Sequence, residues 1–115
     1  MKHADFKDLV RYARARSEKV LDEKRIKYSS EEDRLSAFKT AAMDHDHCPE
    51  KELLGYLSKH MAALNNLIRA TNINGFTPTL EDLLEVTGDI SNYMDLLNGL
   101  YVERMSIDIL MFKGK

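Results

Sequence analysis

Hydrophobic positions recur every three or four residues along most of the chain, the spacing that places side chains on one face of a helix. The first stripe is formed by Phe6, Leu9, Val10, Ala13, Val20 and Leu21. It predicts a helix from about Ala4 to about Lys27. No segment keeps the strict alternation of a half-buried strand, so the pattern predicts an all-α fold.

A polar segment, "YSSEED", separates this helix from the second one. Ser29 or Ser30 is suited to cap the second helix, and Glu32 or Asp33 completes a capping box. The apolar positions of the second helix are Leu35, Phe38, Ala41 and Ala42.

Two longer helices follow. The third is predicted from Pro49, a residue suited to the first helical position, to about Thr71. The segment "NINGFTPT" is the clearest loop in the chain. Thr77 or Thr79 then caps a fourth helix that extends through about Arg104.

The four stripes predict an antiparallel helical bundle whose third and fourth helices form its centre, within a single domain over residues 1–115. The side chains expected in its core are Leu57, Leu64, Leu67, Ile90 and Leu97. Two further leucines, Leu54 and Leu84, lie off the main stripes. They widen the apolar arcs, so we expect a homodimer or larger homo-oligomer.

Composition narrows the class of protein. With 43% hydrophobic and 31% charged residues, the chain fits a globular protein and neither a membrane span nor a disordered segment. The net charge of -2 gives no long-range attraction to nucleic acid, so a nucleic-acid partner is not expected. The one basic cluster, Arg11, Arg14, Arg16 and Lys19, is read as a solvated helix face.

The cytoplasm is the expected compartment. Cys48 is the single cysteine and cannot form an internal disulfide. The first residues, "MKHADFKDLV", lack the apolar run of a secretion signal.

The segment "DHDHCPE", residues 44–50, gathers histidines, a cysteine and aspartates, the side chains that bind metals. Tetrahedral zinc usually takes two ligand pairs separated by a structured loop, and this is one cluster. We therefore interpret it as a polar connection in which Asp46, His47 or Cys48 caps the third helix.

Ionisable residues interrupt the apolar faces. His60 lies in the middle of the third helix's stripe, and Asp89 lies at the inner edge of the fourth. Arg34 brings charge toward the second helix's apolar face, and Gly55 and Gly88 are expected to permit close helix packing. Because burying such charges singly is costly, they must meet one another or a ligand. A structural network and a ligand pocket both remain open.

Three segments in order resemble small phage and prophage proteins related to the MazG-like, all-α nucleotide pyrophosphohydrolases. They are "KYSSEEDRLSAFKTAA", "LLGYLSKHMAALNNLI" and "GDISNYMDLLNGL", within residues 27–104. The pattern falls on Tyr28, Asp33, Arg34, Phe38, Lys39, Lys59, His60, Gly88, Asp89, Asn92 and Tyr93. The resemblance implies a MazG-like bundle that binds a nucleotide or related phosphate-bearing small molecule in a pocket between helices. The binding residues it implies are Asp33, Arg34, Lys59, His60, Asp89, Asn92 and Tyr93.

Catalytic MazG-like enzymes hold magnesium with EExxE and ExxD carboxylate motifs. Here Glu85 precedes Asp89 by four residues, and Val86 stands where ExxD requires an acid. The third helix offers Lys59 and His60 in place of a carboxylate trio. Glu85 and Asp89 are the candidate ligands for a possible magnesium cofactor, whereas hydrolytic activity and its catalytic residues stay unassigned.

Two other functions fit the same sequence. One is a non-enzymatic phage anti-defence protein, for example an anti-CRISPR-type inhibitor, that acts on a host defence protein by direct contact. The other is a helical oligomer with a structural or assembly role. A phage-encoded protein of either kind is expected in the host cytoplasm.

Overall fold

The computed structural model describes residues 1–25 and 33–114. Its elements are α1 (His3–Glu23), α3 (Ser36–Asp44), α4 (Pro49–Asn74), α5 (Leu80–Met105) and a short 3-10 helix (Ile109–Phe112). These described residues contain no strand, so the predicted all-α helical bundle is confirmed. The predicted start of the second helix at Ser29 or Ser30 lies outside them, as do Tyr28 and Glu32.

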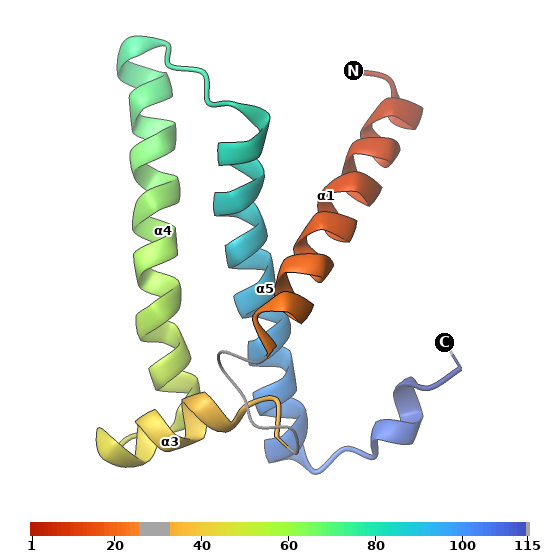
Figure 1. Ribbon diagram of the computed structural model, residues 1–115, viewed down its shortest axis with the longest axis vertical. Coiled ribbons are helices and arrows are strands. Elements are labelled where there is room, and N and C mark those ends of the chain that lie inside the picture. The colour runs from red at the N-terminus through yellow and green to blue at the C-terminus, as the bar shows by residue number, and fades with distance from the viewer. Residues whose placement is uncertain (26–32, 115) are drawn as a thin grey trace.

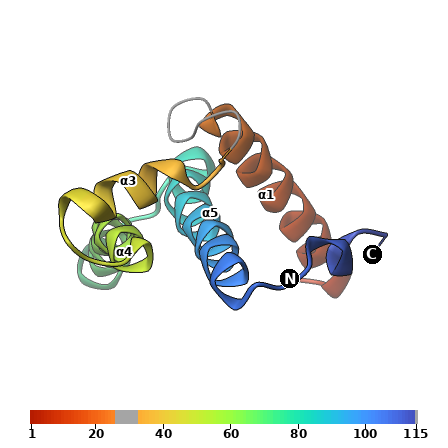
Figure 2. The same cartoon turned by 90° about the horizontal axis from the view of Figure 1, so that it is seen from below.

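The helices form an open arrangement around α5 (Figures 1 and 2). α4 and α5 make an antiparallel hairpin, as predicted for the centre of the bundle (Figure 1). α1 packs against α5 at an incline and runs in the same general direction, while α3 lies across the end of the hairpin opposite its loop (Figure 1). No helix in the described part of the chain is long and apolar enough to cross a membrane.

The ends of the long helices follow local chemistry. Thr79 caps α5, because its side chain accepts a hydrogen bond from the Asp82 backbone N–H at 3.1 Å. Gly75 adopts the left-handed conformation that ends α4, which therefore extends past the predicted end at Thr71 to Asn74. Cys48 occupies the N-cap position of α4, but its side chain makes no capping hydrogen bond.

The core lies at the end of the hairpin that α3 covers. Leu35, Phe38, Leu53 and Leu100 form one buried cluster. Leu57, Tyr93, Leu96 and Leu97 are partly buried side chains that pack against it.

The predicted core was placed too far toward the middle of the hairpin. Leu57, Leu64, Leu67, Ile90 and Leu97 are all half-buried, and none belongs to the buried core. The physical reason is coverage: α3 has only nine residues and lies across one end, so it leaves much of α4 without a second neighbour.

The contact between α1 and α5 depends on a glycine. A Cβ on Gly88 would lie 3.0 Å from Ser17 Oγ, so Gly88 does permit close packing, as predicted. Arg16 Nη1 donates to the Leu84 carbonyl oxygen at 3.1 Å, and Leu84 is buried here rather than off the packed face. The same expectation for Gly55 was wrong, because nothing lies within 4 Å of a Cβ built there.

An ion pair beside the core joins the start of α4 to the end of α5. Arg104 in the last turn of α5 binds both carboxylate oxygens of Glu50 in the first turn of α4, each at 2.8 Å. Glu50 is buried, and its hydrogen bond with Arg104 lowers the pKa of the carboxyl to about 2.

Candidate ligand-binding cleft

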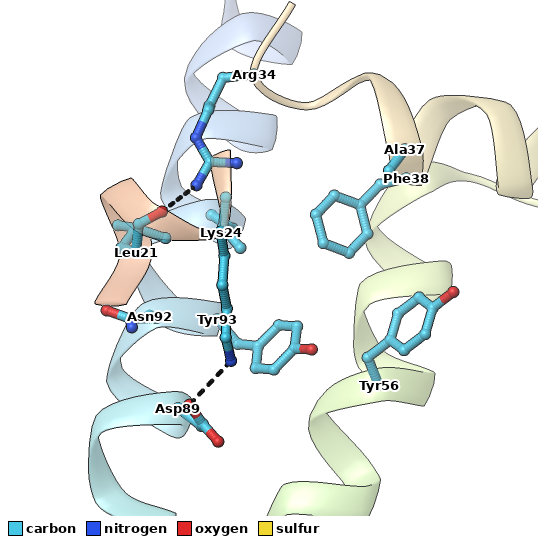
Figure 3. Close-up of a pocket in the computed structure, with 10 residues that line it drawn as sticks. Leu21, Lys24, Arg34, Ala37, Phe38, Tyr56, Asp89, Asn92 and Tyr93 are labelled. Atoms are coloured by element: carbon cyan, nitrogen blue, oxygen red, sulfur yellow. Dashed lines mark hydrogen bonds and ion pairs between the residues drawn. The ribbon is translucent and has the colours of Figure 1, made fainter. Parts of the chain in front are cut away.

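A small cleft of about 80 Å³, open to solvent, lies where α1, α3, α4 and α5 meet (Figure 3). We call it the cleft. Its lining consists of Leu21, Lys24, Arg34, Ala37, Phe38, Tyr56, Asp89, Asn92, Tyr93 and Leu96. Four of the predicted binding residues are in this set, namely Arg34, Asp89, Asn92 and Tyr93.

Arg34 enters the cleft from the segment just before α3. Its Nη2 donates to the Leu21 carbonyl oxygen at 2.8 Å, which fixes the guanidinium against the end of α1 (Figure 3). Its Nη1 is buried and has no hydrogen-bond partner in the described structure. A buried N–H without a partner is costly, so this atom is suited to receive an acceptor from a ligand.

Asp89 lies on the α5 side of the cleft with its side chain only 16% exposed. Lys24 Nζ reaches Oδ1 at 3.5 Å (Figure 3), and His60 Nδ1 lies 3.6 Å from Oδ2. The predicted proximity of Asp89 and His60 is therefore present. Lys24 was not predicted, although it shares a helical face with Ser17 and Leu21, and this position could have indicated it.

Aromatic rings form the remaining walls. Phe38 and Tyr56 meet edge to face, with ring centroids 6.0 Å apart and an interplanar angle of 74°. Tyr93 lies against the His60 ring, with centroids 4.9 Å apart. Figure 3 shows Phe38, Tyr56 and Tyr93 arranged around the same space from α3, α4 and α5. Flat rings of this kind can pack against a planar ligand group.

Asn92 is buried on the α5 wall, with 6% of the residue exposed. Its Oδ1 has no hydrogen-bond partner among the described residues. Arg34 and Asn92 are thus the two cleft residues with an unpaired buried polar atom, one a donor and one an acceptor.

The other predicted residues lie outside the cleft lining. Asp33 accepts hydrogen bonds from Lys39 Nζ at 2.7 Å and the Leu35 N–H at 2.9 Å, and the Lys39 bond lowers the pKa of its carboxyl. Lys59 and Glu85 are exposed. Within the described residues, no third His, Cys, Asp or Glu ligand completes a metal-binding group with Glu85 and Asp89.

A second cluster of chemical groups lies at the turn between α3 and α4. Glu52 Oε2 lies 2.9 Å from His45 Nδ1 and 2.5 Å from His47 Nε2. The bond with Glu52 raises the pKa of His45, and the bond with His45, followed by that with His47, lowers the pKa of Glu52. His47 thus binds Glu52 and does not cap α4. The sequence prediction missed Glu52, whose signal was its position within the first turn of the helix that follows the two histidines.

No known family model, curated protein or solved structure matches this chain.

Proposed function

We propose that the protein binds a nucleotide or a related phosphate-bearing small molecule in the cleft. The observation that carries the proposal is the buried, unpaired Nη1 of Arg34 in a cleft that also contains the Lys24 ammonium. Guanidinium and ammonium groups are the side chains that bind phosphate oxygens most strongly.

The charge of the cleft supports a negatively charged ligand. Its lining contains two cations, Lys24 and Arg34, and one anion, Asp89, although the whole chain has a net charge of -2. Lys24 is 43% exposed and its contact with Asp89 is long, so it is able to turn toward an entering phosphate. The cleft is thus locally positive on an acidic protein, which favours an anion at this place.

The aromatic rings of the cleft are suited to the base of a nucleotide. Tyr56 and Tyr93 offer flat apolar surface for a base beside the buried ring of Phe38, while the Asn92 amide offers an acceptor and donors that can read the base's polar edge. Asp89 is an acceptor for a sugar hydroxyl or a base amine. A ligand with both a phosphate and a ring would use the two kinds of wall together.

The proposal includes the MazG-like relationship. Five residues of the resembling pattern, namely Arg34, Phe38, Asp89, Asn92 and Tyr93, line the cleft, and a sixth, His60, contacts Asp89 and Tyr93. These positions come from all three resembling segments of the sequence, and their meeting in or beside one cleft supports a shared site. Hydrolysis, with magnesium at Glu85 and Asp89, stays a prediction.

A thermal-shift screen of the full chain tests the proposal. Nucleotides, the matching nucleosides and pyrophosphate are each added with and without magnesium, and melting is followed by circular dichroism. A ligand present at 100 times its Kd stabilises the folded state by about 2.7 kcal/mol. We expect nucleotides to raise the melting temperature and nucleosides to leave it unchanged. A screen in which no nucleotide raises it contradicts the proposal.

Two arginine variants locate the effect. Arg34→Gln removes the guanidinium from the cleft and should abolish the nucleotide-dependent shift. Arg16→Gln is the matched control, because Arg16 also bonds a backbone carbonyl of another helix but lies outside the cleft lining. Equal shifts in both variants would show that the nucleotide binds elsewhere.

We also propose that the protein forms a homodimer through α4. Leu54, Met61 and Ile68 recur every seven residues and are 57%, 46% and 56% exposed. Leu57 and Leu64 lie between them, so the five side chains follow the heptad spacing of a coiled-coil seam.

The chemistry of this seam favours a second copy as its partner. The surface groove along it is lined by these five residues together with Ser58, Ala62 and Asn65, and contains no charged side chain. Two identical faces can therefore meet without charge repulsion, and the small Ser58 and Ala62 allow close approach.

Sedimentation equilibrium tests the dimer with a matched pair of substitutions. Met61→Glu places a charge in the middle of the seam and should yield monomer, whereas Met43→Glu, on the 82% exposed Met43 of α3, should leave the dimer intact. A wild-type mass of one 13.2 kDa chain would contradict the dimer. A monomeric chain that pulls down a host defence protein through this seam would favour the direct-contact function instead.

A further inference from the structure

The turn between α3 and α4 brings together two imidazoles and a carboxylate that have no role in the cleft. The ligand atoms of His45, His47 and Glu52 all lie within 4.8 Å of one another. His45 and His47 come from the turn itself, and Glu52 comes from the first turn of α4. In Figure 1 this turn lies at the end of α3 away from α1, so the cluster is separate from the meeting point of α1 and α5.

The backbone of the turn holds the two histidines firmly. The His45 N–H donates to the Ala41 carbonyl oxygen at 3.1 Å, and the His47 N–H donates to that of Ala42 at 3.0 Å. Asp46 between them has a φ of 54°, in the left-handed region, which reverses the chain so that both rings reach one carboxylate. A site for an ion thus exists before any ion arrives, and little ordering would be needed on binding.

We propose that His45 Nδ1, His47 Nε2 and Glu52 Oε2 bind a zinc ion. Imidazole nitrogen and carboxylate oxygen are standard zinc ligands, with bonds of about 2.0–2.2 Å. Ligand atoms around a tetrahedral ion with such bonds lie about 3.3–3.6 Å apart. The His–Glu separations of 2.9 and 2.5 Å require an opening of less than about 1 Å to reach these values.

Each proton that zinc displaces from the site has a defined destination. Each imidazole now shares a proton with Glu52, and zinc takes the place of those shared protons. A neutral ring keeps its proton on the nitrogen that faces away from the ion, and a charged ring releases one proton to solvent. Glu52 then bonds the ion as a carboxylate. Its side chain is only 9% exposed, so few water molecules compete with the ion for its oxygens.

Three protein ligands leave one tetrahedral position open. His45 is 60% exposed and His47 is 23% exposed, so the ion has a path from solvent and its fourth ligand is water or an incoming anion. The adjacent Cys48 is exposed and does not belong to the group of converging ligand atoms. The site is therefore of the open kind and differs from a closed structural zinc site of four side chains.

Isothermal titration of the chelator-stripped full chain with zinc chloride tests the proposal. We expect one zinc ion per chain, with the affinity lowered at least about tenfold by His47→Gln and by Glu52→Gln. His60→Gln and Cys48→Ser are matched controls and should keep the wild-type affinity. Absence of saturable zinc binding, or the same affinity in wild type and His47→Gln, would overturn the proposal.

A second measurement keeps the test decisive if a buried variant fails to fold. His45→Gln changes a mostly exposed side chain, so its circular dichroism spectrum should match wild type while zinc affinity falls. Cobalt(II) should give the intense visible bands of a four-coordinate ion in wild type and lose them in His45→Gln. Bands that persist in this variant would show that the ion binds elsewhere. If the three residues merely fix the turn by hydrogen bonds, zinc leaves both spectra and melting temperature unchanged, which also overturns the proposal.

Discussion

The two ends of the α4–α5 hairpin differ sharply in packing. At the end covered by α3, Leu53 and Phe38 are 1% and 4% exposed. Near the connecting loop, Ile73 and Leu80 are 65% and 55% exposed. The same kind of apolar stripe is thus a core at one end and a surface at the other, because α3 covers only one end.

The same comparison distinguishes the two proposed polar sites from the proposed dimer interface. The cleft and the His45–Glu52 cluster both lie beside the packed end, where rigid neighbours can hold polar groups in place. The α4 seam instead uses apolar side chains that the fold leaves uncovered. A large exposed apolar surface is typical of a contact between proteins.

The largest expected effect is on the buried core. Leu53→Ala should lower the free energy of unfolding by about 2 to 5 kcal/mol, because it removes a fully enclosed side chain and leaves a cavity. Leu80→Ala at the open end is the matched control and should change it by less than about 0.5 kcal/mol. Urea unfolding measures both, and equal losses would erase the difference between the ends.

A pair of glycines gives the next effect. Gly88→Ala and Gly55→Ala should each gain about 1 kcal/mol of helix propensity. The added Cβ meets a neighbour only at residue 88, where it would lie 3.0 Å from Ser17 Oγ. We expect Gly88→Ala to be less stable than Gly55→Ala by about 1 to 2 kcal/mol. Melting curves of the two variants that coincide would show that α1 is free to move away from α5.

Acid should weaken the packed end through Glu50. Folding lowers the pKa of this carboxyl from 4.5 to about 2, so its contribution to stability is complete above the ordinary pKa and is lost as pH falls through about 2. Wild type should therefore lose more stability than Arg104→Gln between pH 5 and pH 2. Urea unfolding measures both losses, with a chelator present to keep metal ions out of the comparison. Parallel stability curves for the two proteins would mean that the ion pair contributes nothing.

The smallest expected effect on stability is at Asp89. Its ion pairs with Lys24 and His60 are 3.5 and 3.6 Å long, and Lys24 is partly exposed, so Asp89→Asn should cost less than about 1 kcal/mol. If the cleft binds nucleotide through this carboxylate, the same variant should lose binding while it melts near the wild-type temperature. A variant that unfolds easily but binds in proportion to its folded fraction would make Asp89 a structural residue.

Most of the helices could be predicted from the sequence because their signals are local. Pro49 and Thr79 mark the starts of α4 and α5 through the chemistry of the first helical turn. The position of the core could not be predicted in the same way. It depends on where α3 crosses the hairpin, and helical periodicity contains no information on that crossing.

The candidate sites show the same division. The proximity of His60 and Asp89 could be predicted from the sequence, because each lies on the inner face of one of two adjacent helices. Lys24 and Glu52 were missed because a charged residue on a helix surface usually faces solvent. Their roles arise from contacts with Asp89 and the two histidines of the α3–α4 turn, which a pattern within one helix does not reveal.

Hydrogen exchange followed by mass spectrometry, with and without saturating nucleotide, tests most directly whether the cleft beside the packed end is the binding site. We predict slower exchange in peptides that contain residues 34–38 and 89–93, which line the cleft, and no change in peptides near the α4–α5 loop. Protection confined to the α4–α5 loop, or no protection in a nucleotide-saturated sample, would contradict the assignment of the cleft.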